Sequence, residues 1–177
     1  MRSSAGWHVE ILQPHHDRRS FACGEPALDR YLRQQAGQDL RRNLGITYVA
    51  VQDVSIVGYY TLSSGAIECR NLPATQARRL PYAMVPVLHI GRLAVDVRMH
   101  GQGLGAGLLL DALTRAAHLS SLVGLHAVEV HALHDRAAKF YVHMGFVALP
   151  ADPMVLYLPM KSVRQLIAQY RLPPPSP

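Results

Sequence analysis

The sequence contains little cysteine and no long apolar run. Only two cysteines are present, Cys23 and Cys69, and nothing in the sequence implies export, so we expect no disulfide framework and two buried, reduced thiols. No segment approaches the roughly 18 consecutive apolar residues of a membrane span, and the first residues lack the apolar core of a signal peptide. We therefore expect a cytoplasmic protein with no membrane contact.

Lysine is also scarce, although the chain as a whole is basic. Sixteen of the 18 basic residues are arginine, the acidic residues number 12, and the formal net charge is +6. Positive charge carried by arginine suits a partner rich in phosphate, but an ordinary basic surface has the same composition. From charge alone, therefore, nucleic-acid binding and an ordinary basic surface are both open.

The length and apolar content suit one domain. The chain has 177 residues, of which 49% are hydrophobic, and this is enough to bury one core. No repeat, low-complexity segment or linker precedes the proline-rich ending RLPPPSP. The sequence therefore predicts a single domain over residues 1–170, followed by an extended tail over residues 171–177.

Hydrophobic periodicity predicts a mixed α/β domain. Strands are expected over residues 7–12, 46–53, 56–70, 85–96, 125–133, 146–150 and 153–160. Helices are expected over residues 26–42, 74–79, 104–116, 135–144 and 162–170. We expect Asp135 to cap the helix that it opens and Gly145 to end it, because their residue types favour those two positions.

A glycine-rich segment, RMHGQGLGAGLLLDAL, lies directly before an apolar helix. Its glycines, 101, 103, 105 and 107, either make a tight turn or leave bare backbone N–H groups for an anion at the helix start. A nucleotidase phosphate loop would need a G-K-[ST] ending, which is absent. A dinucleotide fingerprint would need an acid about 20 residues further on, and Asp111 is too close. The pattern predicts an anion site without naming the anion.

Three segments together resemble one enzyme family. The run from Arg98 to Gly103 fits the signature R/Q-x-x-G-x-G/A, GRLAVD precedes it, and KFYVHMGF follows it. In this order they are similar to the GCN5-related N-acetyltransferases (GNAT), which bind acetyl-coenzyme A. The resemblance implies the GNAT fold, a mostly antiparallel central sheet flanked by helices.

A narrower resemblance covers residues from about Phe21 to Lys161. The segments FACGEPALDRYLRQQA, VGYYTLSSGAI, LPYAMVPVLHIGRLAVD, RAAKFYVHMGF and YLPMK look like the acetyltransferase toxins of bacterial toxin–antitoxin modules. The resemblance implies acetylation of the amino group of aminoacyl-tRNA, arrest of translation, neutralisation by a ribbon-helix-helix antitoxin, and a homodimer. Two alternatives stay open, namely an acetyltransferase acting on a small amine or protein N-terminus, and a binding module without activity.

The same resemblance assigns the cofactor site. Backbone amides from Arg98 to Gly105 would hold the pyrophosphate, while amides near Leu93 and Val95 would pair with the pantetheine arm and polarise the thioester. The expected cofactor contacts are Leu93, Ala94, Val95, Arg98, Met99, His100, Gly101, Gln102, Gly103, Leu104, Gly105 and Tyr141.

Tyr141 is the expected catalytic residue. Its ordinary pKa of about 10 keeps the phenol protonated, so that it can act as the general acid for the departing thiolate. We expect Phe140 and Met144 to face the core and Tyr141 to point elsewhere, although an aromatic core contact is the plain alternative. An α-amine with a pKa near 8 needs no strong base, so neither Glu68 nor Glu129 is given a catalytic role.

The remaining polar residues suggest a tRNA surface and no metal centre. Arginines expected to contact tRNA phosphates are Arg33, Arg41, Arg42, Arg78 and Arg79, with Arg18 and Arg19 as further candidates. His131 and His134 are three residues apart, but this spacing fits no strong zinc pattern. We therefore expect acetyl-CoA as cosubstrate and no metal.

Overall fold

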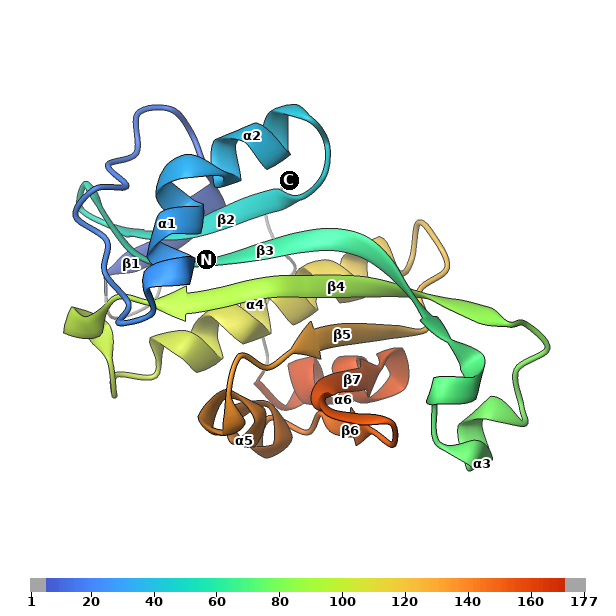
Figure 1. Ribbon diagram of the computed structural model, residues 1–177. Coiled ribbons are helices and arrows are strands. Elements are labelled where there is room, and N and C mark those ends of the chain that lie inside the picture. Colours follow the sequence, from blue (N-terminus) through green and yellow to red (C-terminus); the bar gives the residue numbers. More distant parts are fainter. Residues whose placement is uncertain (1–5, 171–177) are drawn as a thin grey trace. The chain divides into compact units, whose positions relative to one another are not determined.

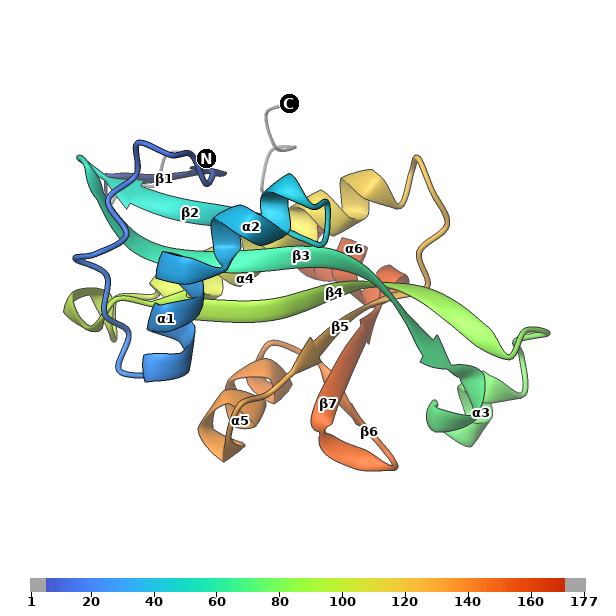
Figure 2. The same cartoon turned by 45° about the horizontal axis from the view of Figure 1, so that its top comes forward.

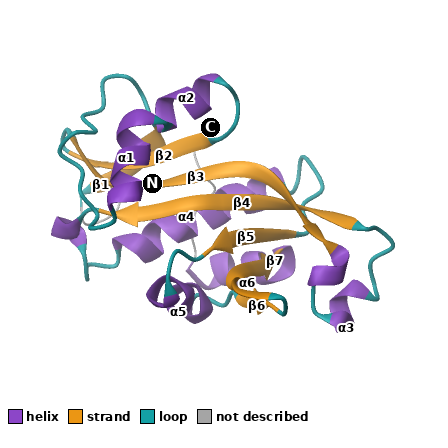
Figure 3. Cartoon of the chain, in the orientation of Figure 1, coloured by secondary structure: helices purple, strands orange, loops and turns teal. Residues whose placement is uncertain are grey.

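The computed structural model describes residues 6–170, so the predicted proline-rich tail over 171–177 lies outside the described residues. Seven strands form a sheet of order β1-β2-β3-β4-β5-β7-β6. Along the chain, helices lie between many of these strands (Figure 3). The β4–β5 pair is parallel, whereas β1–β2, β2–β3, β5–β7 and β6–β7 are antiparallel. The predicted mixed α/β fold with a mostly antiparallel sheet is confirmed. Within residues 6–170 no helix is long and apolar enough to cross a membrane.

The observed elements follow the predicted periodicities closely. The strands are β1 (Trp7–Ile11), β2 (Ile46–Gln52), β3 (Ser55–Glu68), β4 (Met84–Val95), β5 (Ala127–His131), β6 (Val147–Leu149) and β7 (Asp152–Pro159). The helices are α1 (Pro26–Gln34), α2 (Ala36–Arg41), α3 (Ala74–Ala77), α4 (Leu104–Leu119), α5 (Asp135–His143) and α6 (Met160–Tyr170). Two short 3₁₀ turns, η1 (Cys69–Asn71) and η2 (Val97–Met99), follow β3 and β4.

The chain divides into two compact units. Of the described residues, the first unit holds 6–63 and 91–112, and the second holds 64–90 and 113–170. The strands β3 and β4 and the helix α4 each contribute residues to both units. The single-domain boundary at residue 170 stays a prediction.

In the first unit, α1 and α2 follow one another beside the β1–β2–β3 sheet (Figure 1). The Tyr59 hydroxyl on β3 donates a hydrogen bond to the Leu28 carbonyl at 2.8 Å, and this ties α1 to the sheet. The predicted continuous helix over residues 26–42 is wrong, because the chain bends at Gln35. The bend is held by the Tyr31 hydroxyl, which donates to the Asp39 carboxylate across it at 2.9 Å.

In the second unit, the β6–β7 hairpin and α5 lie beside β5 (Figure 2). The predicted cap of α5 is wrong by one residue. His134 occupies the N-cap position, and its Nδ1 accepts a hydrogen bond from the Ala137 N–H at 3.1 Å. Asp135 lies instead in the first turn, where its negative charge favours the helix amino terminus. Gly145 has a φ of +92°, and it ends the helix as expected.

The two cysteines behave as small buried apolar residues. Both Cys23 and Cys69 are free and buried. Burial raises the pKa of the Cys23 thiol to about 12, so it is protonated and unreactive at neutral pH. The expectation of reduced, buried thiols is confirmed.

Candidate functional site

A buried carboxylate anchors the chain where β4 leads into the glycine-rich turn. Asp96 is 1% exposed, and its carboxylate accepts hydrogen bonds from the N–H groups of Ala22 and Arg98. The Arg98 guanidinium adds two bonds, at 2.7 and 2.9 Å. Burial alone raises the pKa of the Asp96 carboxyl, but the hydrogen bonds from Arg98 and Ala22 outweigh this effect and hold it below its usual range. Arg98 therefore fixes the turn through Asp96, a role that its sequence motif does not indicate.

Other side chains of the turn bind the backbone of the turn itself. The His100 ring donates from Nε2 to the Val95 carbonyl at 2.8 Å, which ties the turn to the end of β4. Gln102 donates from Nε2 to the Arg98 carbonyl at 2.9 Å. The polar side chains at 98, 100 and 102 thus stabilise the loop.

Three of the four glycines have structural roles of two kinds. Gly101 and Gly103 have φ values of +75° and +78°, and a Cβ built on either would meet no atom within 4 Å. They allow a left-handed turn and also leave its surface bare. A Cβ on Gly107, by contrast, would lie 3.0 Å from the Trp7 ring, so this glycine permits close packing of α4 on β1. Gly101 and Gly103 therefore form the tight turn that the sequence suggests, and the approach of an anion to their bare backbone stays a prediction.

Unpaired N–H groups gather at the start of α4. Within residues 6–170, the backbone N–H groups of Gly101, Gly103, Leu104 and Gly105 have no hydrogen-bond acceptor. The first N–H groups of a helix have no intrahelical partner, and they lie at the positive end of the helix dipole. Because the three residues at 101–103 are exposed, this amino terminus is an open site for an anion such as a pyrophosphate.

Tyr141 is the buried residue of α5. It is 6% exposed, and its ring packs near those of Phe140 and Phe146, with centroids 5.2 and 5.6 Å away. The expectation that Tyr141 points away from the core is wrong, since Tyr141 and Met144 are buried while Phe140 is only half-buried. Burial raises the pKa of Tyr141 to about 12. Within the described chain its hydroxyl has no hydrogen-bond partner, so it remains available as a proton donor.

Glu68 and Glu129, for which no catalytic role is expected, both interact with neighbouring side chains. Glu68 forms an exposed ion pair with Arg70. Glu129 on β5 accepts a hydrogen bond from His89 on β4 at 2.9 Å. Burial by itself raises the pKa of the Glu129 carboxyl, but His89 and His131 together lower it below its usual range. The Glu129 side chain is therefore ionised at neutral pH.

The arginines expected to contact tRNA occupy different environments. Arg33 donates from Nη2 to the Phe21 carbonyl at 2.6 Å and therefore has a structural role as well. It also lines an open pocket together with Arg18 and Arg19. The pair at the end of α2 and the pair after α3 are exposed; these residues are Arg41, Arg42, Arg78 and Arg79. Arg92, which the sequence did not single out, stacks on the Tyr31 ring at 3.5 Å.

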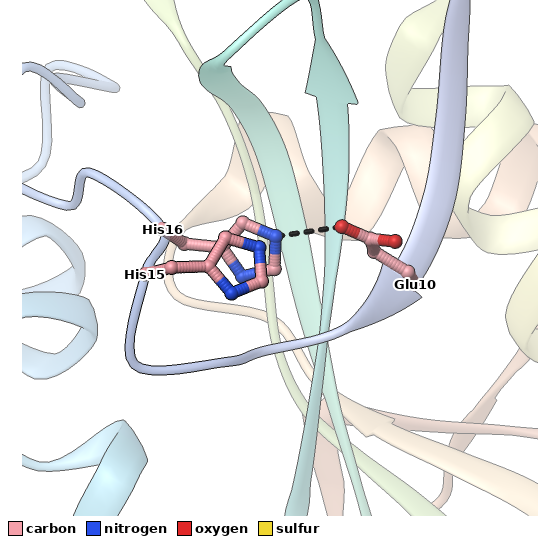
Figure 4. A group of neighbouring side chains, drawn as sticks. All are labelled: Glu10, His15 and His16. Carbon is pink, nitrogen blue, oxygen red and sulfur yellow. Dashed lines mark hydrogen bonds and ion pairs between the residues drawn. The ribbon is translucent and has the colours of Figure 1, made fainter.

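A cluster of Glu10, His15 and His16 in the first unit resembles a metal site in composition (Figure 4). The His16 side chain is 2% exposed, and its Nε2 lies 2.7 Å from the Glu10 carboxylate. Its Nδ1 accepts the Gln13 N–H at 2.8 Å, so Nε2 carries the proton and donates it to Glu10. Both ring nitrogens of His16 are therefore occupied, and the cluster holds the 13–16 loop onto β1.

Substitution His16→Ala is expected to lower the free energy of unfolding by about 2 kcal/mol, because it strands the Gln13 N–H and removes a hydrogen bond to a charged group. Urea unfolding followed by circular dichroism measures this difference. His15→Ala is the matched control, since His15 is exposed and is expected to leave stability unchanged. Equal stability of the His16 variant and the wild type would contradict the structural role.

Comparison with known proteins identifies the family. Residues 43–148 match the model described as an acetyltransferase (GNAT) domain. The chain is 43% identical over 151 residues to a tRNA-acetylating toxin of Mycobacterium tuberculosis, covering 85% of this chain and 90% of that protein. It is similar to the solved structure of AtaT complexed with acetyl-methionyl-tRNAfMet, with 32% identity, a TM-score of 0.85, and coverage of 90% and 98% of the two chains.

A second solved relative is a tyrosine-to-phenylalanine mutant of AtaT bound to the C-terminus of the antitoxin AtaR and acetyl-CoA. It is 31% identical, with a TM-score of 0.80 and coverage of 92% of this chain and 99% of that chain. The family model spans more than half of the sequence. The chain therefore belongs to the GNAT acetyltransferases.

Proposed function

We propose that this protein is a toxin that transfers the acetyl group of acetyl-CoA to the α-amino group of an aminoacyl-tRNA and thereby blocks translation in the cytoplasm. The observation that carries the proposal is the 43% identity to a tRNA-acetylating toxin over 90% of that protein's length. The open amino terminus of α4 supports it independently, because coenzyme A carries a pyrophosphate.

In this proposal, the glycine-rich turn and the end of β4 contact the cofactor. The N–H groups from Gly101 to Gly105 donate to the pyrophosphate, and the bare surface at Gly101 and Gly103 lets it approach the backbone. The β4 amides near Leu93 and Val95 pair with pantetheine and with the developing oxyanion of the thioester. In this assignment the side chains of the turn have a supporting role: Arg98 binds the Asp96 carboxylate, while His100 and Gln102 bind backbone carbonyls.

Tyr141 acts as the general acid. The neutral amine attacks the thioester carbonyl, an N–C bond forms as the C–S bond breaks, and the departing thiolate takes the Tyr141 proton. The nitrogen loses one proton to water, and water returns a proton to the Tyr141 oxygen. A pKa of about 12 keeps the phenol protonated at neutral pH. One solved structure of AtaT carries a tyrosine-to-phenylalanine substitution, and this supports the proposal that a tyrosine acts in the reaction.

The macromolecular partners that we propose for this chain are of the kinds seen in the solved complexes of its relatives. Solved structures of AtaT include a complex with acetyl-methionyl-tRNAfMet and an AtaT–AtaR complex bound to DNA. For this chain we propose that four exposed arginines, Arg41, Arg42, Arg78 and Arg79, contact tRNA phosphates, and that Arg33, which lines a pocket, adds to them. A DNA-binding antitoxin of ribbon-helix-helix type and a homodimeric toxin complete the proposal.

Labelled acetyl-CoA offered with charged and with deacylated tRNA tests the function. We expect label on total charged tRNA and none on deacylated tRNA, because only the aminoacyl ester offers the α-amine. Mild base hydrolysis of the product should release the label as an N-acetyl amino acid. Transfer to small amines or protein N-termini with none to charged tRNA would contradict the proposal and favour a different acceptor.

A further inference from the structure

Three metal-binding side chains lie on one face of adjacent strands in the second unit. His89 on β4 is paired in register with Glu129 on β5, and the two strands are parallel. His131 follows Glu129 by two residues, so both side chains leave β5 on the same face. His89 is thus 40 or more positions from the other two residues in the sequence, and no local spacing indicates that it joins them.

The donor atoms of the trio are close together. His89 Nδ1 lies 2.9 Å from Glu129 Oε2, and His131 Nε2 lies 3.6 Å from Glu129 Oε1. One donor atom from each residue lies within 4.8 Å of the others, and the two histidine rings are 4.8 Å apart. Donors around a tetrahedral zinc ion are roughly 3.4 Å apart, given metal–ligand bonds of about 2.1 Å. Small side-chain rotations therefore suffice to surround an ion.

A glycine of the neighbouring strand lies beside the trio. A Cβ on Gly65 of β3 would lie 3.5 Å from the His89 Cβ and 4.0 Å from Glu129 Oε2. Glycine at this position keeps the space beside the trio free of a side chain. Glu129 is 12% exposed and His89 24%, whereas His131 is 56% exposed. The trio is thus enclosed at its base and open to solvent at His131.

The histidine nitrogens of the trio are free to coordinate, in contrast to those of the Glu10 cluster. There, the Gln13 N–H fixes the tautomer of His16 and both of its nitrogens are used. In the trio, the hydrogen bonds and ion pairs of both histidines within residues 6–170 run only to Glu129. Each imidazole can therefore change tautomer and present a lone pair to an ion.

We propose that His89, Glu129 and His131 form a binding site for a divalent transition-metal ion, with zinc as the best-suited ion. Two imidazoles and one carboxylate are zinc ligands in proteins, and three protein ligands leave a fourth position for water. The proposed acetyl transfer needs no metal.

Calorimetric titration of the full-length, chelator-treated protein with zinc chloride tests the site, without acetyl-CoA or tRNA. We expect saturable binding of one ion per chain. Glu129→Gln and His131→Ala should each weaken binding by at least about 10- to 100-fold, the loss that even an outer-shell substitution causes. Cobalt chloride provides a second readout, because ligation by the trio gives visible absorption bands that the two variants lose.

His15→Ala is the matched control, since it removes a histidine from the cluster of the same composition and should bind zinc like the wild type. Circular dichroism checks that each variant is folded; His131 is largely exposed, and Gln has the shape of Glu. Absence of saturable binding by the wild type, or wild-type binding by both trio variants, would overturn the proposal. Neither result bears on acetyl transfer, which is assayed separately with charged tRNA.

Discussion

Tyr141→Phe is expected to lower kcat for acetyl transfer by about 10²- to 10⁴-fold, the contribution of a positioned general acid. The dissociation constant for acetyl-CoA should change little, because the removed hydroxyl has no hydrogen-bond partner within residues 6–170. For the same reason the fold should be retained, since the ring still fills its place beside Phe146. Initial rates with charged tRNA and calorimetry with acetyl-CoA measure the two quantities.

The pH dependence gives a second readout of this role. A general acid must be protonated, so its contribution is complete below its pKa and is lost as pH rises through it. With the Tyr141 pKa raised to about 12 by burial, we expect no alkaline loss of kcat from this group between about pH 7 and 10.

Tyr157→Phe is the matched control for Tyr141→Phe. Tyr157 lies in the apolar core of the second unit and is also buried, so the substitution likewise removes one hydroxyl from a buried tyrosine, here one that interacts with Gln76. We expect its kcat to remain at the wild-type level. A Tyr141 variant as active as this control would remove Tyr141 from the mechanism.

Gly103→Val is expected to weaken acetyl-CoA binding by at least about tenfold. A β-branched residue at a φ of +78° is strained by about 1–2 kcal/mol, and the turn relieves this strain by rotating its N–H groups out of position. A loss of about 1.4 kcal/mol in binding free energy corresponds to tenfold in affinity. The valine side chain would also cover backbone that is now bare. Calorimetric titration with acetyl-CoA measures the effect.

Gly124→Ala is the control for a glycine substitution as such. A Cβ at this position would also meet nothing within 4 Å, but its backbone lies outside the left-handed region. We expect wild-type affinity and an unchanged melting temperature from this variant. Tight acetyl-CoA binding by Gly103→Val would show that the turn at 101–105 does not hold the pyrophosphate.

Local patterns in the sequence predicted the order of elements well. The alternation in β2 and β3 and the apolar spacing in α4 depend on neighbours within a few residues, and these are visible in the sequence. The break at Gln35 was not visible, because it depends on the Tyr31 hydroxyl reaching Asp39 across the bend. Periodicity alone continues the helix through that point.

The part of the candidate site that is formed by backbone groups could be predicted from the sequence. The environments of its side chains could be predicted less well. The glycines at 101 and 103 indicated the turn, since few other residues accept those φ values. The partner of Arg98 depends on the burial of Asp96, and the burial of Tyr141 depends on the packing of α5. The trio around Glu129 required the register between β4 and β5, which no local pattern specifies.

The contact between Trp7 and Gly107 provides the protein with an optical probe. Trp7 is the only tryptophan in the chain, and its ring lies against the first turn of α4, a short distance along the helix from the unpaired N–H groups. Indole emission responds to the polarity and electric field around the ring. Occupation of the helix terminus by a doubly charged pyrophosphate would alter that field, so ligand binding can be followed by intrinsic fluorescence without any label.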